Sequence, residues 1–349
     1  MALFSDEYDF VNAKVHGMRS RLYEADRLSG LLSCTGLPEL LQILSPRRGE
    51  VFAGDVAVER ILTAQYFQAL DEVCEHMSGR SKALIEAILL RRSVENVKVA
   101  LQFWHMTLAK ESLPGPVENY MVPDPHVALP PMAELLQSAT LSDLAGKLPW
   151  DAFSPDFAEA LEPAIERYEK DHVVFYVLVA IDKAYFELLW RRVQALRRAD
   201  RAVAREIVGT ELDIHNIFAV MRLRLNYDLP PEEVLALLPV HGRLLTGTTL
   251  AQMCWAEDSD AIIARLPGVY QRVFEGVTGE FGDSQRSFWD HLYRLANRTF
   301  YRSMFNIGAV LGFYVFKKIE FMNLASVIQG YRYELSAGAI RSGLIPLAR

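Results

Sequence analysis

The sequence predicts an all-α protein that contains an internal repeat. Apolar residues recur in steps of three or four, as at Ile85, Ile88 and Leu89, which is the spacing of one helix face. No Asn-Gly or Asp-Gly pair between alternating apolar runs indicates a β-hairpin. A short pattern that contains asparagine also occurs four times within helix-like sequence. Such repetition predicts one structural unit copied along the chain.

Each copy has an acidic or hydroxyl residue, an apolar residue, any residue, asparagine, and a small or apolar residue. The asparagines are separated by 84, 120 and 107 residues and are Asn12, Asn96, Asn216 and Asn323. Asparagine within a helix is unfavourable unless its amide is hydrogen-bonded. Each amide therefore either ties its helix to a neighbouring segment or contacts a partner. We prefer the structural interpretation because buried polar groups nearly always serve such bonding.

Two other features recur with the asparagines. An aromatic pair precedes three of them by about thirty residues or slightly less, at Tyr66-Phe67, Tyr185-Phe186 and Phe300-Tyr301. Further upstream, a threonine that can cap a short helix stands at Thr35, Thr140 and Thr249. The predicted unit is a short capped helix, a long helix with the aromatic pair, and a return helix that begins near the asparagine.

The first asparagine, Asn12, has no aromatic-pair helix before it. Either the first unit is truncated, or the N-terminal helix packs beside the hairpin of another unit.

Proline residues divide the chain into three segments of similar length. Six prolines lie between Pro114 and Pro131, and a second break follows at Pro230-Pro231. Because proline lacks an N–H and fixes φ, no helix continues through these clusters. We therefore predict repeat domains at 1–113, 114–228 and 229–349. Residues 164–206 contain no proline or glycine, which predicts one long helix or two helices in line.

The composition excludes several classes of protein. A 51% hydrophobic share with 23% charged residues predicts a large core and not disorder. The net charge of −7 gives no reason to expect a nucleic-acid partner. Three widely spaced cysteines without CxxC fit a reducing cytoplasm. The most apolar stretch, 303–316, is shorter than the roughly 20 residues that span a bilayer, so no transmembrane span is expected.

The usual catalytic motifs are missing from the sequence. It has no phosphate-binding GxxxxGK[ST] loop, no GxGxxG after a strand, no HExxH and no GxSxG. Its eight histidines include no pair at i,i+3 or i,i+4, and structural zinc sites need clustered ligands. We therefore predict no catalytic residue, no cofactor and no metal site.

A run of arginines is the strongest charge feature. Its members are Arg191, Arg192, Arg197, Arg198 and Arg201, followed by Arg205. The run could contact an acidic partner or lipid head groups, or it could be the solvated face of a helix. The solvated face is the preferred interpretation because charged helix faces are ordinary.

Three segments carry a family resemblance: Glu7-Tyr8-Asp9-Phe10-Val11-Asn12 with the residues up to Leu22, the stretch from Glu211 to Ile217, and the stretch from Gly312 to Leu324. They resemble the C subunit of the bacterial and archaeal A/V-type ATPase, whose family includes the d subunit of the eukaryotic vacuolar ATPase. The matches are short, but they span nearly the whole chain. The chain departs from the resemblance at its 114–131 proline stretch and its arginine-rich helix.

The resemblance implies three helical-hairpin domains around a pseudo-threefold axis, in the shape of a funnel. It also implies a non-catalytic central-stalk component that joins the rotor shaft to the membrane proteolipid ring, on the cytoplasmic face of the membrane. Two alternatives remain at this stage. One is a helical-repeat enzyme or ligand-binding protein with a closed pocket, and the other is an extended solenoid adaptor.

Overall fold

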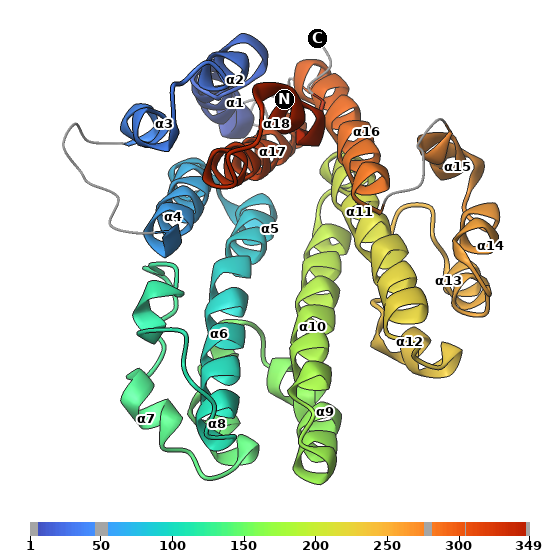
Figure 1. The fold of residues 1–349 in the computed structure, drawn as a ribbon. Coiled ribbons are helices and arrows are strands. Elements are labelled where there is room, and N and C mark those ends of the chain that lie inside the picture. The colour runs from blue at the N-terminus through green and yellow to red at the C-terminus, as the bar shows by residue number, and fades with distance from the viewer. Residues whose placement is uncertain (1–5, 46–54, 276–280, 304, 347–349) are drawn as a thin grey trace.

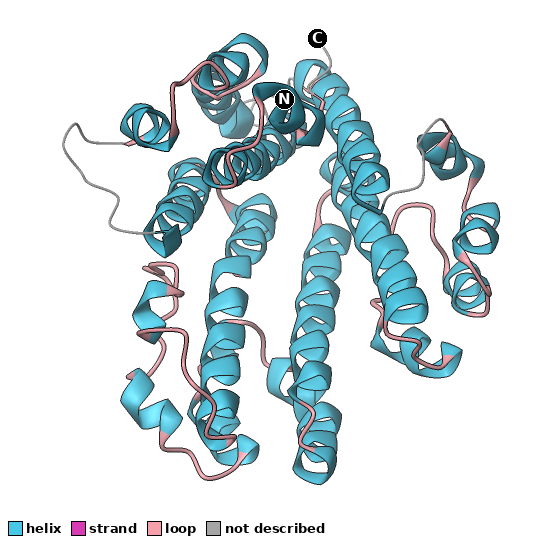
Figure 2. Cartoon of the chain, viewed as in Figure 1, coloured by secondary structure: helices cyan, strands magenta, loops and turns pink. Residues whose placement is uncertain are grey.

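The computed structural model describes residues 6–45, 55–275, 281–303 and 305–346. Within these ranges every regular element is a helix and no strand occurs (Figures 1 and 2). The predicted all-α class is therefore confirmed. No helix in the same ranges is both long and apolar enough to cross a membrane.

The N-terminal half contains these elements: α1 (Asp6–Arg19), α2 (Ala25–Leu31), α3 (Leu37–Leu44), α4 (Asp55–Cys74), α5 (Gly79–Leu89), α6 (Arg91–Leu108), η1 (Val117–Asn119), α7 (Met132–Leu136), α8 (Leu141–Lys147), η2 (Trp150–Ala152) and α9 (Phe157–Asp171). The C-terminal half contains these: α10 (Val174–Ala195), α11 (Arg198–Met221), η3 (Arg222–Asn226), α12 (Pro231–Leu237), α13 (Gly247–Cys254), α14 (Ser259–Ala264), α15 (Gly268–Phe274), α16 (Phe281–Arg302), α17 (Gly308–Arg332) and α18 (Ala337–Gly343).

Three hairpins of long helices form the centre of the molecule (Figure 1). They are α4 with α5 and α6, α10 with α11, and α16 with α17. Helix α4 packs on α5, α5 and α6 pack on α10, and α11 packs on both α16 and α17. Helix α17 then packs back on α4. The contacts between long helices therefore form a closed series.

Two hydrophobic clusters hold these helices together. The larger one runs through all three hairpins, and its buried members include Leu84, Ile181, Leu212, Phe288 and Val315. The smaller one joins the two ends of the chain, with Leu28, Leu40, Leu62, Leu324 and Val327 among its members. The first and last parts of the sequence therefore share a core.

The N-terminal helix α1 packs on α17 and on α4. Of the two alternatives left open by the sequence, the structure has the second, in which this helix packs beside the hairpin of another unit.

The prediction of one or two helices in line over 164–206 is wrong. Helix α9 ends at Asp171, because the next residue, His172, has a φ of 56° in the left-handed region, and α10 begins at Val174. A second break follows at Leu196 and Arg197, which are both extended, and separates α10 from α11. The residues at both breaks are neither proline nor glycine. The absence of proline and glycine from 164–206 therefore did not mean that the helix was continuous.

The predicted threonine cap is confirmed at one of the three positions. Thr140 accepts a hydrogen bond from the Asp143 N–H at 3.1 Å and caps α8. At α13 the cap is Thr246, which accepts from the N–H of Thr249 at 3.2 Å. The predicted cap at Thr249 is therefore wrong, because the cap lies three residues earlier. At α3 the N-cap position is Gly36, without a side-chain cap.

Candidate functional site

Three of the four repeated asparagines bind the backbone of a segment that lies 22 to 26 residues downstream. The amide of Asn96 donates to the Val122 carbonyl and accepts from the Val122 N–H, both at 2.8 Å. Asn323 does the same with Ile345, at 3.2 and 2.8 Å. Asn216 donates to the carbonyl of Pro239 at 2.9 Å. This geometry supports the structural interpretation of the pattern.

The first residue of the pattern lies three positions before the asparagine and thus on the same helix face. Asp213 accepts from the N–H groups of Arg243 and Leu244 at 3.1 and 2.7 Å. Glu320 accepts from the N–H of Tyr23 at 2.7 Å. Asp213 and Glu320 therefore bind main-chain N–H groups of segments that lie outside the helices.

The first asparagine makes a different contact. The Asn12 amide donates to the carbonyl of Ser303 at 3.4 Å, across 291 residues of sequence. It joins α1 to the turn between α16 and α17. Of the predicted return helices, α11 and α17 begin well before their asparagines, so the predicted start near the asparagine is wrong for both.

Side chains from all three hairpins meet in a polar cluster at the centre. The Tyr314 hydroxyl lies 2.8 Å from both carboxylate oxygens of Glu211, and Lys318 forms an ion pair with the same carboxylate. Tyr66 and Tyr185 belong to this cluster through their electrostatic coupling to Glu211. Burial raises the pKa of all three tyrosines, and the Glu211 carboxylate adds to the effect. The three hydroxyls therefore remain protonated.

A second polar group joins α6 to α10. Asp182 lies 2.9 Å from an Arg91 Nη and 2.9 Å from the Lys98 Nζ, and Arg91 also pairs with Glu95. The Arg91 and Glu95 side chains remain 32% and 42% exposed, so solvent reaches this group. Burial lowers the pKa of the nearby His215 to about 4, which keeps that imidazole neutral.

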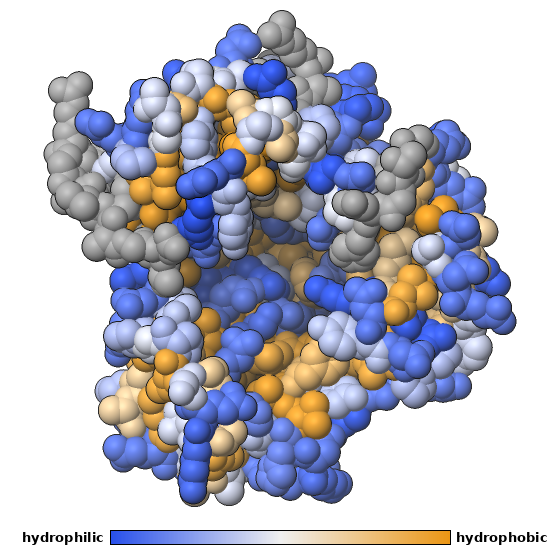
Figure 3. All heavy atoms as spheres, in the orientation of Figure 1, coloured by the Kyte–Doolittle hydropathy of each residue, from blue (hydrophilic) through white to orange (hydrophobic). Residues whose placement is uncertain are grey.

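The face of the molecule seen in Figure 1 is hollowed between the three hairpins, and both hydrophilic and hydrophobic residues border the hollow (Figure 3). The described residues contain no group of three or more His, Cys, Asp or Glu side chains that could hold a metal ion. The arrangement can recognise a protein surface by shape and charge, and its ion pairs link the surrounding helices.

The predicted arginine run does not form one continuous helix face, because the turn at Leu196 and Arg197 divides it. Arg191 pairs with Asp156, and Arg201 donates to the Leu196 carbonyl at 2.7 Å. Arg197 and Arg198 are exposed at the start of α11, and Arg192 is exposed near the end of α10.

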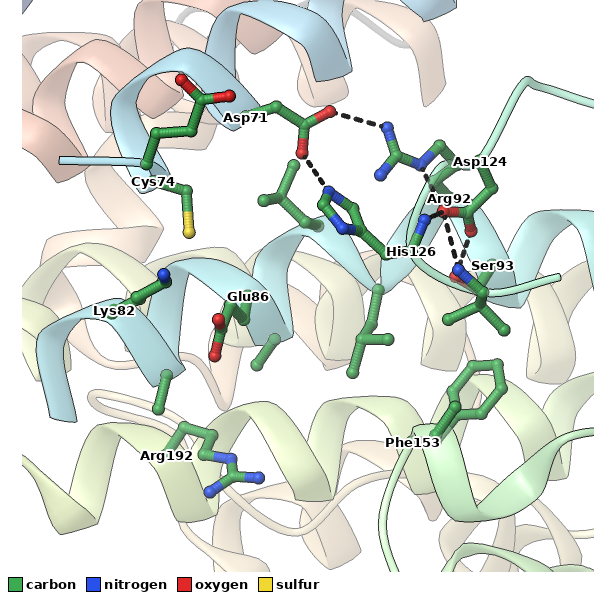
Figure 4. A pocket seen from close by; sticks show the side chains of 17 residues that line it. Asp71, Cys74, Lys82, Glu86, Arg92, Ser93, Asp124, His126, Phe153 and Arg192 are labelled. Atoms are coloured by element: carbon green, nitrogen blue, oxygen red, sulfur yellow. Dashed lines mark hydrogen bonds and ion pairs between the residues drawn. The ribbon is translucent and has the colours of Figure 1, made fainter. Parts of the chain in front are cut away.

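A cavity of about 420 Å³ lies between the first hairpin, the proline-rich segment and α10 (Figure 4). Arg92 bridges Asp71 at 3.0 Å and Asp124 at 3.2 Å, and the His126 ring lies 2.9 Å from Asp71. These contacts hold the proline-rich segment against α4 and α6 at one side of the cavity.

Sequence reasoning did not identify the central polar cluster. Glu211, Tyr314 and Tyr66 lie on three different helices, and the first two are 103 residues apart. One signal was the repeated aromatic pair, which contains Tyr66 and Tyr185, and another was a charged residue inside an apolar helical stretch, as at Glu211 between Val208 and Ile217. Neither signal names the partner side chains.

Comparison with known proteins gives a consistent result over the whole chain. The family described as ATP synthase (C/AC39) subunit matches residues 11–343. The C subunit of the A-type ATP synthase of Methanocaldococcus jannaschii is 21% identical, over 97% of this chain and 86% of that protein. The corresponding protein of Methanosarcina mazei is 23% identical, over 98% of this chain and 93% of that protein. The one from Haloferax volcanii is 21% identical, over 97% of each chain.

Proposed function

Because the chain belongs to the ATP synthase (C/AC39) subunit family and is therefore a non-catalytic subunit of a rotary ATPase, we propose that it is the socket of the central stalk. In this role it receives the lower end of the rotor shaft and sits on the membrane proteolipid ring. It transmits torque between the ATP-converting head and proton or sodium transport through the membrane, and it works on the cytoplasmic face.

The observation that carries this proposal is the closed series of long helices around a hollowed face (Figures 1 and 3). A torque-transmitting socket needs stiffness and a recess, and close-packed helices deform little. The three hairpins support a pseudo-threefold funnel, with repeat domains near 1–113, 114–228 and 229–349. No reaction centre is needed for this role.

The same observation argues against the two alternatives. A ligand-binding protein needs an enclosed, largely apolar pocket, whereas the hollow in Figure 3 is open toward solvent. A solenoid adaptor stacks its units without closure, whereas α17 packs back on α4.

Co-purification tests the proposal directly. The chain is expressed with the shaft proteins and the proteolipid ring of its own organism, and the mixture is separated by size exclusion in detergent. We expect one complex that contains all three components, and no ATP hydrolysis by the chain alone. A folded chain that binds neither component, or that hydrolyses ATP by itself, contradicts the socket role.

A further inference from the structure

Six cationic side chains gather where α5, α10 and α11 meet. We call them the basic surface, and they are Arg80, Lys82, Arg192, Arg198, Arg201 and Arg205. Two contacts place Arg80, Lys82 and Arg192 in this region. An Arg80 Nη donates to the carbonyl of Ala195 at 3.0 Å, and Lys82 and Arg192 line the same cavity (Figure 4). Arg198, Arg201 and Arg205 follow one another at helical spacing on α11, so they share a face.

No carboxylate among the described residues forms an ion pair with a side chain of the basic surface. The side chains of Lys82, Arg192 and Arg198 form no hydrogen bond or ion pair with any described residue. Arg80 and Arg201 bind only main-chain carbonyls at the end of α10, and Arg205 lies 5.8 Å from the Trp190 ring centre. By contrast, Arg91 and Lys98 of the polar group between α6 and α10 are both paired with Asp182.

Few acidic groups offset this charge. Glu75, Glu86, Asp71 and Asp124 line the same cavity as Lys82 and Arg192, and the two aspartates are paired with Arg92. Glu206 is paired with Arg243, and Asp200 is buried and accepts from the N–H of Ile307. Among the described residues, six cations thus face two carboxylates, Glu75 and Glu86, that have no ion-pair partner, on a chain whose net charge is −7. A local excess of one sign on a chain of the other sign favours a partner of complementary charge.

The shape of this region favours a protein partner over a membrane. The cavity of about 420 Å³ makes the surface concave beside Lys82 and Arg192, so it can accept a protruding side chain. None of the large hydrophobic residues exposed in the described part of the chain lies on α5, α10 or α11. Helices that bind the membrane surface pair cationic residues with exposed apolar ones that enter the lipid.

We propose that the basic surface docks an acidic loop of a partner protein. The carboxylates of that loop pair with Lys82, Arg192 and Arg198. Only the identity of the partner rests on the proposed function: if the chain is the socket, the partner is a neighbouring component of the rotary complex. The inference adds to that function the charge of one face by which the chain binds its partner.

The first test uses a fluorescein-labelled octaglutamate peptide and fluorescence anisotropy with the full chain. Binding should weaken when the NaCl concentration is raised, because salt screens exposed charges over about 10 Å at 0.1 M. The triple variant Lys82→Glu, Arg192→Glu, Arg198→Glu should bind about tenfold more weakly or worse. The matched control is Lys170→Glu, Arg272→Glu, Arg341→Glu, which changes the charge equally at cations elsewhere on the chain and should bind like the original chain.

Three results of this test overturn the inference. They are no peptide binding at low salt, an equal loss in the control variant, or binding that salt does not affect. A parallel measurement uses vesicles that contain phosphatidylserine. If the chain binds these vesicles through the three cations and does not bind the peptide, the surface contacts lipid and the inference is wrong.

Co-purification of the same variants separates this inference from the socket role. Loss of the shaft or the ring from the triple variant alone supports both proposals. If the triple variant still assembles like the original chain, the basic surface is not a docking site, and the socket role stands. If the original chain binds neither component, the socket role fails, and the peptide measurement still decides the inference.

Discussion

At the scale of single residues, polar side chains on helices hold irregular segments in place. Asn96, Asn216 and Asn323 bind main-chain groups of segments that have no helix or strand of their own. The repetition of the pattern predicted a shared structural role for these asparagines. Their partners were not predictable, because a main-chain carbonyl or N–H leaves no mark on the sequence.

Replacing Asn216 by alanine should lower the free energy of unfolding by about 1–3 kcal/mol, because the Pro239 carbonyl loses its donor in a buried site. Urea unfolding measures this change. Asn119→Ala is the control, since that side chain is exposed and makes no bond within the described chain, and it should be neutral. Unchanged stability with lost partner binding would contradict the structural role.

The imidazole of His215 should make the protein less stable in acid. Its pKa is about 4 in the folded protein and about 6.5 in the unfolded chain. Below pH 6.5 the unfolded state therefore binds the extra proton, and stability is lost as the pH falls toward 4. The expected loss is about 2 kcal/mol by pH 5.

The measurement is urea unfolding at several pH values for the original chain and for His215→Gln, which should show a flatter profile. The difference between the two is needed because burial raises the pKa of Asp213 to about 6. The contribution of Asp213 has the opposite sign, because its protonated form stabilises the folded protein. This stabilisation is lost as the pH rises through 6. Parallel profiles for the two proteins would mean that His215 does not titrate as described.

At the scale of elements, glycine lets α16 and α17 approach closely. A Cβ on Gly312 would lie 2.9 Å from the Phe300 Cβ and 3.1 Å from the Ala296 carbonyl oxygen. The apolar spacing predicted the helices themselves. It did not predict the crossing or the role of Gly312, because these depend on which helix lies opposite.

Gly312→Ala should destabilise the protein by about 1–3 kcal/mol, because the crowded atoms belong to a backbone and to the stem of a side chain. Thermal and urea unfolding measure the change. Gly17→Ala in α1 is the matched control, since no atom lies within 4 Å of its added Cβ. The control should be neutral or stabilising by up to about 1 kcal/mol, and similar losses in both variants would exclude close packing as the cause.

At the scale of the whole molecule, the three predicted repeat segments share one hydrophobic core. Residues of that core come from all three hairpins, as Leu84, Ile181 and Phe288 illustrate. The repeats and the proline clusters indicated three units in the sequence. They could not indicate that the last unit packs against the first, because closure depends on contacts between residues nearly 300 positions apart, such as Glu320 and Tyr23.

We expect a single cooperative heat-unfolding transition for the whole chain, because no hairpin keeps its core when the others are removed. Differential scanning calorimetry measures it. The isolated segment 114–228 should lack stable tertiary structure, since α10 would lose α5 and α6 and α11 would lose α16 and α17. Separate transitions, or a stable isolated segment, would show that the units are independent.

The smaller hydrophobic cluster has a consequence for biosynthesis. Leu28, Leu40 and Leu62 are made early, but the residues that cover them, such as Leu324 and Val327, belong to one of the last helices of the chain. Because chains emerge from the ribosome N-terminus first, this apolar face stays uncovered until translation is nearly complete. Nascent chains should therefore depend on chaperones, and products that stop before α17 should be removed by proteases.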